Sequence, residues 1–549
     1  MKLRYRGHIN ASRIIVMLLL LALMLPLWSK NTNENFFNKV HLFTEVLYKL
    51  QEYYVEDIDV DKLIDAAIEG MMDETDPHTV FFKPEDFERF NSSTQGEFGG
   101  LGITIDKKGD YITVVSPIEG TPAYRLGIRT GDKIVTVDGE DVVGMKTDEV
   151  ISRMRGKKGT LVVIGISRPG VKEVLQFDVI RDIIHVDSIP YAMVLDNGIG
   201  YIRMRQFSRT IAADLRRELD RLEGEGMRGL LIDLRYNPGG LLDQAVDTVN
   251  EFIGKDKRVV FTKGASRGAS TTYVTRFDRM RSGYPVIVLI NEASASASEI
   301  FAGSLQDYDK ALVVGTNSFG KGSVQRLFPL SDGYGIKITT AKYYINSGRC
   351  IHKEVNDKLL KGKKVSEEEK EKVAEENHKN IYHTQSGREV YGGGGITPDL
   401  VIPQRKLTQF AVKLQQKGVI FDFAVDYMID HSDDVTVDFR ADDTLVSNFL
   451  DQLPEDITYT QADLDSTQSY LKTSLTATIL QAKFNDEVSY RVSMKEDTQL
   501  QEALGLFDRF SSLEEMFAYA QSCNTNKEEH DGTQHVTEAH QAGDKGRVR

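Results

Sequence analysis

Two short segments in the middle of the chain contain the residue types that nucleophilic catalysis requires. The first is a ladder in which serines alternate with alanines from Ser294 to Ser298 and which ends at Glu299. The second is a loop in which Lys321 lies between two glycines. A serine hydroxyl becomes a useful nucleophile beside a group that accepts its proton, and an uncharged lysine amine is such a group. The two segments predict a serine hydrolase that uses lysine in place of histidine.

Each segment follows a predicted buried strand. Residues 285–290 and 311–315 are short apolar runs rich in β-branched side chains, which is typical of strands buried on both faces. Apolar residues recur at helical spacing after the ladder, so the serines lie where a strand turns into a helix. Free N–H groups and the positive end of the helix dipole favour an oxyanion at such a position. The loop over 316–322 is rich in small residues and is expected to fold over the first turn of that helix.

The same residues also have a purely structural interpretation. An ordinary lysine has a pKa of about 10.4 and is protonated at neutral pH, although burial lowers that pKa by several units because it disfavours the charge. Arginine stays protonated in proteins, so it cannot act as a base in this way. Serines are common caps at helix starts, and a lysine in a glycine loop can be a simple surface residue. The residues alone therefore do not choose among Ser294, Ser296 and Ser298.

A third segment, 229–242, predicts a buried strand, a sharp turn and a helix start. Two glycines in the turn, Gly239 and Gly240, would let the backbone approach a ligand closely. Amide groups of this turn could therefore face a developing oxyanion. The alternative is an ordinary strand-to-helix turn that Asn237 and Pro238 merely shape.

The ladder and the lysine loop resemble the signature of the carboxy-terminal processing peptidases, which are tail-specific serine proteases with a Ser/Lys dyad. The resemblance implies that Ser296 is the nucleophile, that Lys321 is the base and that Gln325 orients the lysine. It also implies that Gly239 helps to form the oxyanion hole. The amide of Ala297 is assigned as its partner by analogy with other serine hydrolases.

Residues 97–182 resemble a PDZ domain. The resemblance rests on a Gly-Leu-Gly-Ile segment, followed by a Gly-Ile-x-x-Gly-Asp pattern at 127–132. In such a domain a glycine-containing loop offers N–H groups to the terminal carboxylate of a peptide, which adds a strand to the edge of the sheet. The loop implied here consists of Leu101, Gly102 and Ile103.

The amino terminus predicts export. Basic residues precede an uncharged run over 14–28, which has the length of a signal-peptide core or a short membrane anchor. Neither a small-x-small cleavage pattern nor a lipobox cysteine follows, which favours an uncleaved signal anchor. Because basic flanks stay in the cytoplasm, the rest of the chain is expected on the periplasmic or extracytoplasmic face of a bacterial membrane.

Composition narrows the classes of partner and cofactor. The net charge of −14 argues against a nucleic-acid partner. The two cysteines, Cys350 and Cys523, exclude a disulfide framework, although one long-range bridge stays open. No His-Glu-x-x-His pattern occurs, and three histidines in the polar tail are spaced five residues apart. The sequence therefore implies no metal and no organic cofactor.

These segments predict a multidomain α+β protein, with a crotonase/ClpP-like α/β protease core, an inserted β-rich PDZ domain and helical flanking regions. The expected parts are a signal anchor or signal peptide at 1–30, an amino-terminal helical region at 31–92, the PDZ domain at 97–182, the Ser/Lys protease core at 188–403, a mostly helical carboxy-terminal region at 404–522 and a disordered tail at 523–549. A charged segment at 353–386 departs from the shortest family members and is expected to be a surface helix or a flexible insertion, with an adaptor-docking or gating element as the alternative.

The resemblance implies an exported serine endopeptidase that recognises unstructured carboxy-terminal tails through its PDZ domain and cleaves them through an acyl-enzyme. The implied partners are protein substrates with accessible carboxy-terminal tails and the membrane, through the amino-terminal anchor. An adaptor protein and a homo-oligomer also fit the family.

Three alternatives stay open. One is a PDZ scaffold on an inactive protease fold that binds tails without cleavage, although the intact Ser296, Lys321 and Gln325 argue against it. Another is a different acyl-transfer enzyme on the crotonase-like architecture, which would not need a domain that reads carboxylates. The third is a standard triad with a histidine base, but no histidine lies in a setting that matches one.

Overall fold

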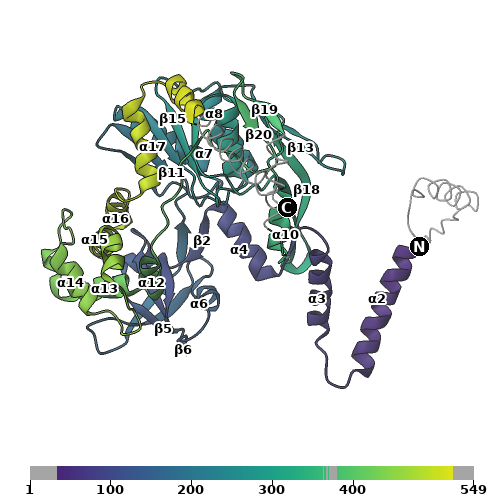
Figure 1. The fold of residues 1–549 in the computed structure, drawn as a ribbon. Helices are drawn as coiled ribbons and strands as arrows, with labels where there is room; N and C mark the ends of the chain where they lie inside the picture. The colour runs from purple at the N-terminus through teal and green to yellow at the C-terminus, as the bar shows by residue number, and fades with distance from the viewer. Residues whose placement is uncertain (1–33, 363, 367–368, 370–371, 373–379, 524–549) are drawn as a thin grey trace, which may run out of the picture. The chain divides into compact units, whose positions relative to one another are not determined.

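The computed structural model describes residues 34–362, 364–366, 369, 372 and 380–523 (Figure 1). The chain divides into two compact units between Asp76 and Pro77, and each unit is described by itself. The predicted signal anchor at 1–30, the tail after Cys523 and part of the charged segment at 353–386 lie outside the described residues.

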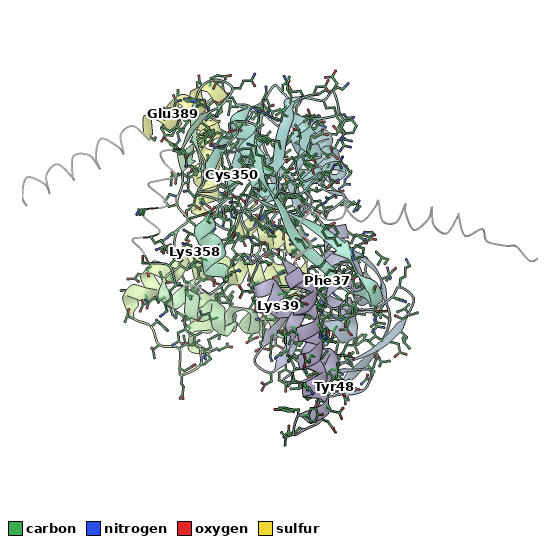
Figure 2. The ribbon with its side chains drawn as sticks, turned by 90° about the vertical axis from the view of Figure 1, so that its right-hand side faces the viewer. Phe37, Lys39, Tyr48, Cys350, Lys358 and Glu389 are labelled. Atoms are coloured by element: carbon green, nitrogen blue, oxygen red, sulfur yellow. The ribbon has the colours of Figure 1, made fainter. Side chains whose placement is uncertain are left out.

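Two helices form the described part of the first unit, α2 (Glu34–Tyr53) and α3 (Val60–Asp73). Helix α3 begins after Asp59, whose side chain accepts from the Lys62 N–H at 3.2 Å. Many apolar side chains of α2 are exposed, including Phe37 and Tyr48, which are labelled in Figure 2. Among the helices of the described residues, none is both long and apolar enough to cross a membrane.

A six-stranded sheet forms the centre of the second unit, in the order β10-β11-β12-β15-β16-β21. All neighbouring strands are parallel except β10, which pairs antiparallel with β11. The strands are β10 (Tyr191–Val194), β11 (Ile199–Arg203), β12 (Gly229–Asp233), β15 (Val286–Ile290), β16 (Leu312–Gly315) and β21 (Leu400–Val401). Strand β15 lies directly before the serine ladder and α9, and strand β16 lies directly before the lysine loop. They correspond to the apolar runs predicted at 285–290 and 311–315.

Helices cover both faces of this sheet, which explains why the central strands are apolar throughout. On one face Val286, Val288 and Ile290 of β15 pack with three helices. On the other face Ile287 and Leu289 pack with a helix from near the end of the chain (Figure 1). The helices are α7 (Ile211–Gly224), α8 (Leu242–Ile253) and α9 (Ala297–Asp307) on the first face and α17 (Thr498–Arg509) on the second.

A second sheet of the core has the strand order β1-β18-β13-β14, with β17 paired to β18. It supplies the strand that leaves the lysine loop, because β17 begins at Ser323. Its strands are β1 (Val80–Phe82), β13 (Arg258–Lys263), β14 (Thr272–Val274), β17 (Ser323–Pro329) and β18 (Gly335–Ile345). Smaller elements of the core are α4 (Pro84–Gln95), α10 (Glu354–Leu360), β19 (Ile381–His383) and β20 (Glu389–Tyr391).

The PDZ sheet has the order β3-β4-β5-β7-β8, with β6 paired to β5, so β3 is an outer strand. Strands β2 and β9 pair antiparallel where the chain enters and leaves this sheet, as expected of an inserted domain. The elements are β2 (Glu97–Gly100), β3 (Ile103–Lys108), β4 (Tyr111–Pro117), α5 (Pro122–Arg125), β5 (Lys133–Val137), β6 (Glu140–Asp141), α6 (Thr147–Met154), β7 (Leu161–Ser167), β8 (Leu175–Ile180) and β9 (Asp182–His185).

The carboxy-terminal region is helical and has a core of its own. Its helices before α17 are α12 (Gln409–Lys417), α13 (Val419–His431), α14 (Asp443–Asp451), α15 (Gln461–Lys483) and α16 (Asp486–Ser493). Cys350 and Cys523 are free thiols, so no disulfide joins this region to the protease core. The multidomain α+β architecture predicted from the sequence is confirmed.

Candidate active site

The outer serines of the ladder are structural. Ser294 is fully buried, and its Oγ donates to the Leu234 carbonyl at 2.8 Å and accepts from the Asn291 N–H at 2.9 Å. Ser298 is also fully buried, and its Oγ donates to the Asn237 carbonyl at 3.0 Å. A hydroxyl that satisfies buried backbone groups in this way stabilises the fold.

The middle serine has a different environment. Ser296 is only partly buried and has a φ of +56° directly before α9. A non-glycine residue holds a positive φ only where its surroundings enforce it, and such strain gathers at functional sites. A strained turn between a strand and a helix is also how hydrolases of another fold expose a nucleophilic serine. The structure thus distinguishes Ser296 from its two neighbours, which residue types alone do not.

A buried carboxylate, Glu299, joins the serine to the lysine loop. Its Oε2 accepts from the N–H groups of Ser296 at 2.8 Å and Lys321 at 2.9 Å. Its Oε1 accepts from the Gly320 N–H at 2.7 Å and the Ser318 hydroxyl at 2.5 Å. Burial raises the pKa of Glu299 to about 7, although these hydrogen bonds favour the ionised form. The sequence did not single out Glu299 as functional, but an acidic residue in the first helical turn was an available signal.

Tyr343 of β18 forms a second link between the same two residues. Its hydroxyl lies 3.1 Å from the Ser296 carbonyl oxygen and 2.5 Å from the Lys321 carbonyl oxygen, and it can donate to either. The side chain is buried, and burial together with the nearby Glu299 carboxyl raises its pKa well above the usual value. The backbones of Ser296 and Lys321 are therefore held together from two sides. No local sequence signal identifies Tyr343.

The positions on either side of Lys321 have no room for a side chain, because another segment packs against both glycines. A Cβ on Gly320 would lie 2.7 Å from the Lys353 Cβ, and one on Gly322 would lie 2.7 Å from the His352 nitrogen. The Lys353 N–H also donates to the Gly320 carbonyl at 2.9 Å. The loop is thus packed on both sides of Lys321, as a residue with a fixed role requires.

Gln325 lies in β17, the strand that leaves this loop. Its Nε2 donates to the Ser323 hydroxyl at 2.9 Å and lies 3.4 Å from the Thr339 Oγ1. A bulge between Val324 and Gln325 interrupts the pairing of β17 with β18. A bulge re-aims the side chains beside it, which makes it a common device next to active sites.

Gly239 lies directly against the candidate nucleophile. With a φ of +97°, a Cβ on this residue would come within 2.6 Å of the Ala295 oxygen, 2.7 Å of the Ser296 Cβ and 2.8 Å of the Ala297 nitrogen. Only glycine fits such an approach. The Gly239 N–H itself donates to the Asn237 Oδ1 at 2.9 Å in this structure. The two candidate oxyanion amides, Gly239 and Ala297, are thus adjacent, and one of them has an internal acceptor.

Asn237 shapes this turn, in line with the structural alternative predicted for it. The side chain is fully buried, and its Nδ2 donates to the Met204 carbonyl at 2.9 Å. Its carbonyl accepts from the Ala295 N–H and the Ser298 hydroxyl, both at 3.0 Å. Pro238 is exposed.

The predicted carboxylate loop of the PDZ domain lies beside the outer strand β3. Leu101 is 3% exposed and belongs to the PDZ core, so only its backbone could face a ligand. Gly102 has a φ of +81°, and its carbonyl accepts from the Thr121 hydroxyl at 3.0 Å. Ile103 begins β3 opposite Pro117. An outer strand beside such a loop is suited to pairing with an added peptide.

Comparison with known proteins identifies the family. Residues 198–359 match the model of peptidase family S41, and residues 113–168 match the model of the PDZ domain. A carboxy-terminal-processing protease of Bartonella bacilliformis is 38% identical over 325 residues, which cover 58% of this chain and 74% of that protein. The carboxy-terminal processing protease CtpA of Bacillus subtilis is 35% identical over 326 residues, which cover 59% of this chain and 68% of that protein. The chain belongs to the carboxy-terminal processing proteases of family S41.

One solved structure illustrates how far the likeness extends. A photosystem II D1 C-terminal processing protease is 27% identical, with a TM-score of 0.32, and the match covers 57% of this chain and 89% of that chain. The family models and the two curated relatives confirm the recognition stated from the motifs, and this S41 protease is a serine protease with a PDZ domain.

This S41 protease also has a histidine near its lysine loop. The Nε2 of His352 lies 3.1 Å from the Asp357 Oδ2, and the Nε2 of His78 lies 3.4 Å from the Asp357 Oδ1. Burial lowers the pKa of His352, although Asp357 acts in the opposite direction. The described residues contain no group of three or more histidine, cysteine or acidic side chains that could hold a metal ion.

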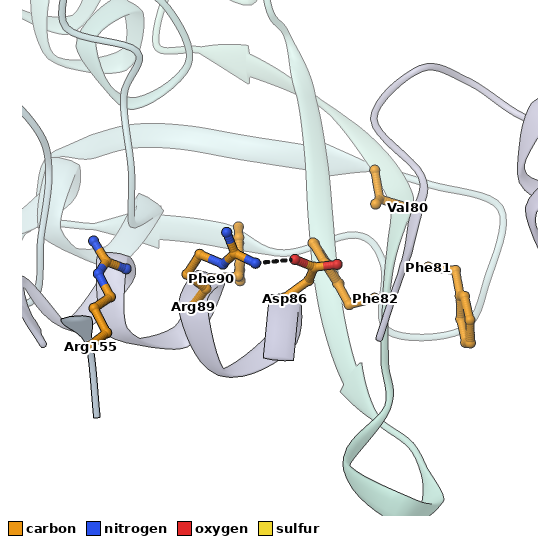
Figure 3. A pocket seen from close by; sticks show the side chains of 7 residues that line it. All are labelled: Val80, Phe81, Phe82, Asp86, Arg89, Phe90 and Arg155. Atoms are coloured by element: carbon orange, nitrogen blue, oxygen red, sulfur yellow. Dashed lines mark hydrogen bonds and ion pairs between the residues drawn. The ribbon is translucent and has the colours of Figure 1, made fainter. Parts of the chain in front are cut away.

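A cavity of about 530 Å³ lies beside the PDZ domain of this protease (Figure 3). Aromatic side chains of β1 and α4 line it together with two arginines. Arg89 pairs with Asp86 at 2.8 Å, and Arg155 lies over the ring of Phe98. None of the candidate catalytic residues lines this cavity.

Proposed function

We propose that this S41 protease is an exported endopeptidase that captures unstructured carboxy-terminal tails and cleaves them with a Ser296–Lys321 dyad. The observation that carries the proposal is the double link of Glu299 and Tyr343 between the backbones of these two residues, beside Gly239. Such preorganisation is what a nucleophile and its base require.

The chemistry is acyl transfer. The neutral Lys321 amine takes the proton of the Ser296 hydroxyl, and Oγ attacks the carbonyl carbon of the scissile bond. The amides of Gly239 and Ala297 stabilise the tetrahedral oxyanion, and Gln325 orients Lys321. The C–N bond then breaks, the Lys321 ammonium protonates the leaving amine, and an acyl-enzyme remains. Lys321 next deprotonates a water, whose oxygen attacks the carbonyl carbon of the ester. The ester C–O bond then breaks, and the Lys321 ammonium returns the proton to the Ser296 Oγ.

The oxyanion hole is completed when substrate binds. The Gly239 N–H donates to the Asn237 Oδ1 at 2.9 Å, so it must turn toward the substrate oxygen before it can stabilise an oxyanion. Gly239 and Gly240 have φ values of +97° and +148°, and glycine adjusts such angles at little cost. Catalytic hydrogen bonds often tighten in this way only in the substrate complex.

The tail is captured at the outer strand of the PDZ sheet. The N–H groups of the loop Leu101, Gly102 and Ile103 receive the terminal carboxylate, and the tail adds a strand to β3. The names of the Bartonella and Bacillus relatives, which both specify carboxy-terminal processing, support this substrate class. The basic residues and apolar run before residue 29 support export and a membrane anchor. The protein would then act on the extracytoplasmic face of the membrane, where an adaptor or a second copy could join it.

Degradation of an unfolded reporter with an apolar tail tests the proposal. The exported part of the wild type is compared with Ser296→Ala, Lys321→Ala and the matched control Ser294→Ala, each with a free or an amidated tail. We expect the first two variants to lose at least about 10⁴-fold in kcat, as is usual for members of a catalytic unit. Ser294→Ala should stay active and melt at a lower temperature, because it leaves a buried N–H without its acceptor.

The outcomes separate the alternatives. Cleavage by wild type that amidation weakens supports both the dyad and the reading of tails. Tight binding of tails without cleavage would instead favour a PDZ scaffold on an inactive protease fold. Full activity of Lys321→Ala would exclude lysine as the base.

A further inference from the structure

We infer that Asp497, the residue before α17, is a positioning residue for the turn that carries Gly239. The inference rests on the proposed role of Gly239 as an oxyanion donor. Asp497 belongs to the carboxy-terminal helical region, outside the segments that match the S41 and PDZ models. The oxyanion turn of this chain would therefore depend on a region that lies beyond the matched protease segment.

Asp497 meets the turn through a two-point contact with Arg235. The Nη1 of Arg235 donates to the Asp497 Oδ1 at 3.0 Å, and Nη2 donates to Oδ2 at 2.6 Å. Nη1 also donates to the Gln499 Oε1 at 3.0 Å. The Arg235 side chain is only 4% exposed and the Asp497 side chain is 28% exposed, so the arginine end of these bonds is shielded from water. A fork of this kind fixes direction as well as distance.

The protease core also holds the same arginine, through Asp233 and Arg203. Asp233 at the end of β12 is fully buried and accepts from the Arg235 backbone N–H at 2.9 Å and from its Nη2 at 2.8 Å. Arg203 donates to Asp233 at 2.7 Å and to the Arg235 carbonyl at 2.8 Å. Two guanidinium groups thus face two carboxylates. Removing one charge from such a buried set is costly because the others lose their compensation.

This network lies immediately before the strained part of the turn. Tyr236 follows Arg235 with a φ of +59°, and its N–H donates to the Asn291 Oδ1 at 2.9 Å. Gly239 follows three residues later, against Ser296. A strained backbone persists only where its surroundings hold it. Without Asp497, Arg235 keeps its core-side contacts and only the neutral Gln499 on the side of α17, so the start of the turn is held less firmly.

The same helix provides a matched control at its other end. Arg228, just before β12, pairs with Asp508 at 2.6 Å, and the two side chains are 48% and 57% exposed. This pair also joins α17 to the core, but it lies at the opposite end of β12 from the turn. A defect in docking of α17 should follow from either pair, whereas a defect in the oxyanion turn should follow from Asp497 alone.

The experiment compares Asp497→Asn with Asp508→Asn in the full chain. Asparagine keeps an oxygen for the Leu500 N–H, so α17 keeps its cap while the charge is lost. We expect kcat on a tailed substrate to fall about tenfold in Asp497→Asn with KM changed by less than about twofold, because an oxyanion donor acts only in the transition state. Asp508→Asn should differ from wild type by less than about twofold in both constants.

The affinity for a peptide aldehyde distinguishes an effect on the oxyanion hole from a merely structural effect. Its adduct with Ser296 places an oxyanion in the hole, whereas the matching peptide alcohol does not. Affinity for the aldehyde should fall about tenfold in Asp497→Asn, with affinity for the alcohol unchanged. Asp497→Glu, which keeps the charge, should recover part of the loss.

Several results would overturn the inference. These are an unchanged or higher kcat in Asp497→Asn, an unchanged affinity for the aldehyde, or equal losses in the two asparagine variants. If Asp497→Asn fails to fold, Gln499→Met decides, because it removes one acceptor of Arg235 and should lower aldehyde affinity at least about twofold.

Absence of any cleavage that depends on Ser296 in wild type would refute the proposed function, and the inference with it. Cleavage by wild type with an unaltered Asp497→Asn refutes the inference alone.

Discussion

The candidate active site and the PDZ edge are built on opposite principles. Around Ser296 the polar groups are buried and bonded, and Glu299 alone accepts from four donors. Strand β3 of the PDZ domain is an outer strand, and its residues are half-buried or exposed. Chemistry needs groups fixed before the reaction, whereas capture of varied tails needs backbone groups that a peptide can pair with.

The two regions nevertheless share one device. Gly239 in the active site and Gly102 in the PDZ loop both have a positive φ and no room for a Cβ. The first brings a backbone against Ser296, the candidate nucleophile, and the second shapes the loop before the outer strand. The same substitution, glycine to alanine, should therefore change the rate of the reaction in one region and the recognition of tails in the other.

Among the substitutions that test this comparison, Gly239→Ala should have the largest effect. A Cβ would lie 2.6 Å from the Ala295 oxygen and 2.7 Å from the Ser296 Cβ, so either the turn or the serine must move. We expect kcat to fall about 10²–10³-fold, the usual cost of one lost oxyanion donor. Steady-state cleavage of a tailed peptide measures the effect. Gly226→Ala is the matched control, because Gly226 has a φ of +81° and nothing within 4 Å of an added Cβ. Equal losses in both variants would mean that backbone strain, and not contact with Ser296, sets the rate.

Glu299→Gln should have the second largest effect, because it weakens the link between Ser296 and the lysine loop. An amide NH₂ would replace one oxygen and would face N–H donors in place of accepting from them. A lost hydrogen bond to a charged group costs about 1.5–3 kcal/mol, so we expect kcat to fall about 10–100-fold. Single-turnover acylation measures this step directly. Normal acylation in Glu299→Gln would show that the link from Glu299 is dispensable.

Glu299 should also make stability depend on pH. Burial raises its pKa from 4.5 to about 7, so between these values the folded state holds a proton that the unfolded state has lost. The contribution is fully present below pH 4.5 and is lost as pH rises through about 7. The free energy of unfolding of wild type relative to Glu299→Gln should therefore fall with rising pH, by on the order of 3 kcal/mol. Chemical denaturation at a series of pH values tests this, and parallel curves for the two proteins would contradict it.

The site shows which features local sequence can predict. The strands before the ladder and the lysine loop follow from apolar runs, and the turn at Gly239 follows from its glycines. The confirmed recognition of the family came from motifs of this local kind. The choice of Ser296 needed that resemblance, because the bonds of Ser294 and Ser298 run to residues about sixty positions away.

The features that the sequence did not predict are contacts between distant segments. Tyr343 reaches Ser296 from β18, and Asp497 reaches Arg235 from the far end of the chain. Asp307 at the end of α9 is a charged residue, yet it is fully buried and pairs with the buried Arg349 at 3.0 Å. A buried charge depends on a partner, and no local pattern encodes that partner.

Gly102→Ala should have the smallest effect and the most selective one. A Cβ would lie 2.2 Å from the Thr121 Cβ, so the loop before β3 must shift. We expect kcat/KM for a free carboxy-terminal tail to fall about tenfold, the value of one hydrogen bond to a charged group, with little change for an amidated tail. Gly109→Ala is the matched control at the other end of β3, with a φ of +58° and nothing within 4 Å.

The ratio of kcat/KM for the free tail to kcat/KM for the amidated tail decides whether the PDZ loop recognises the carboxylate. If Gly102→Ala lowers cleavage of both tails equally, the loop supports the fold and reads no carboxylate. If it lowers only cleavage of the free tail, the loop recognises the terminus while the dyad keeps its rate. In that case recognition and chemistry can be changed independently, because the rigid network around Ser296 does not depend on the outer strand of the PDZ domain.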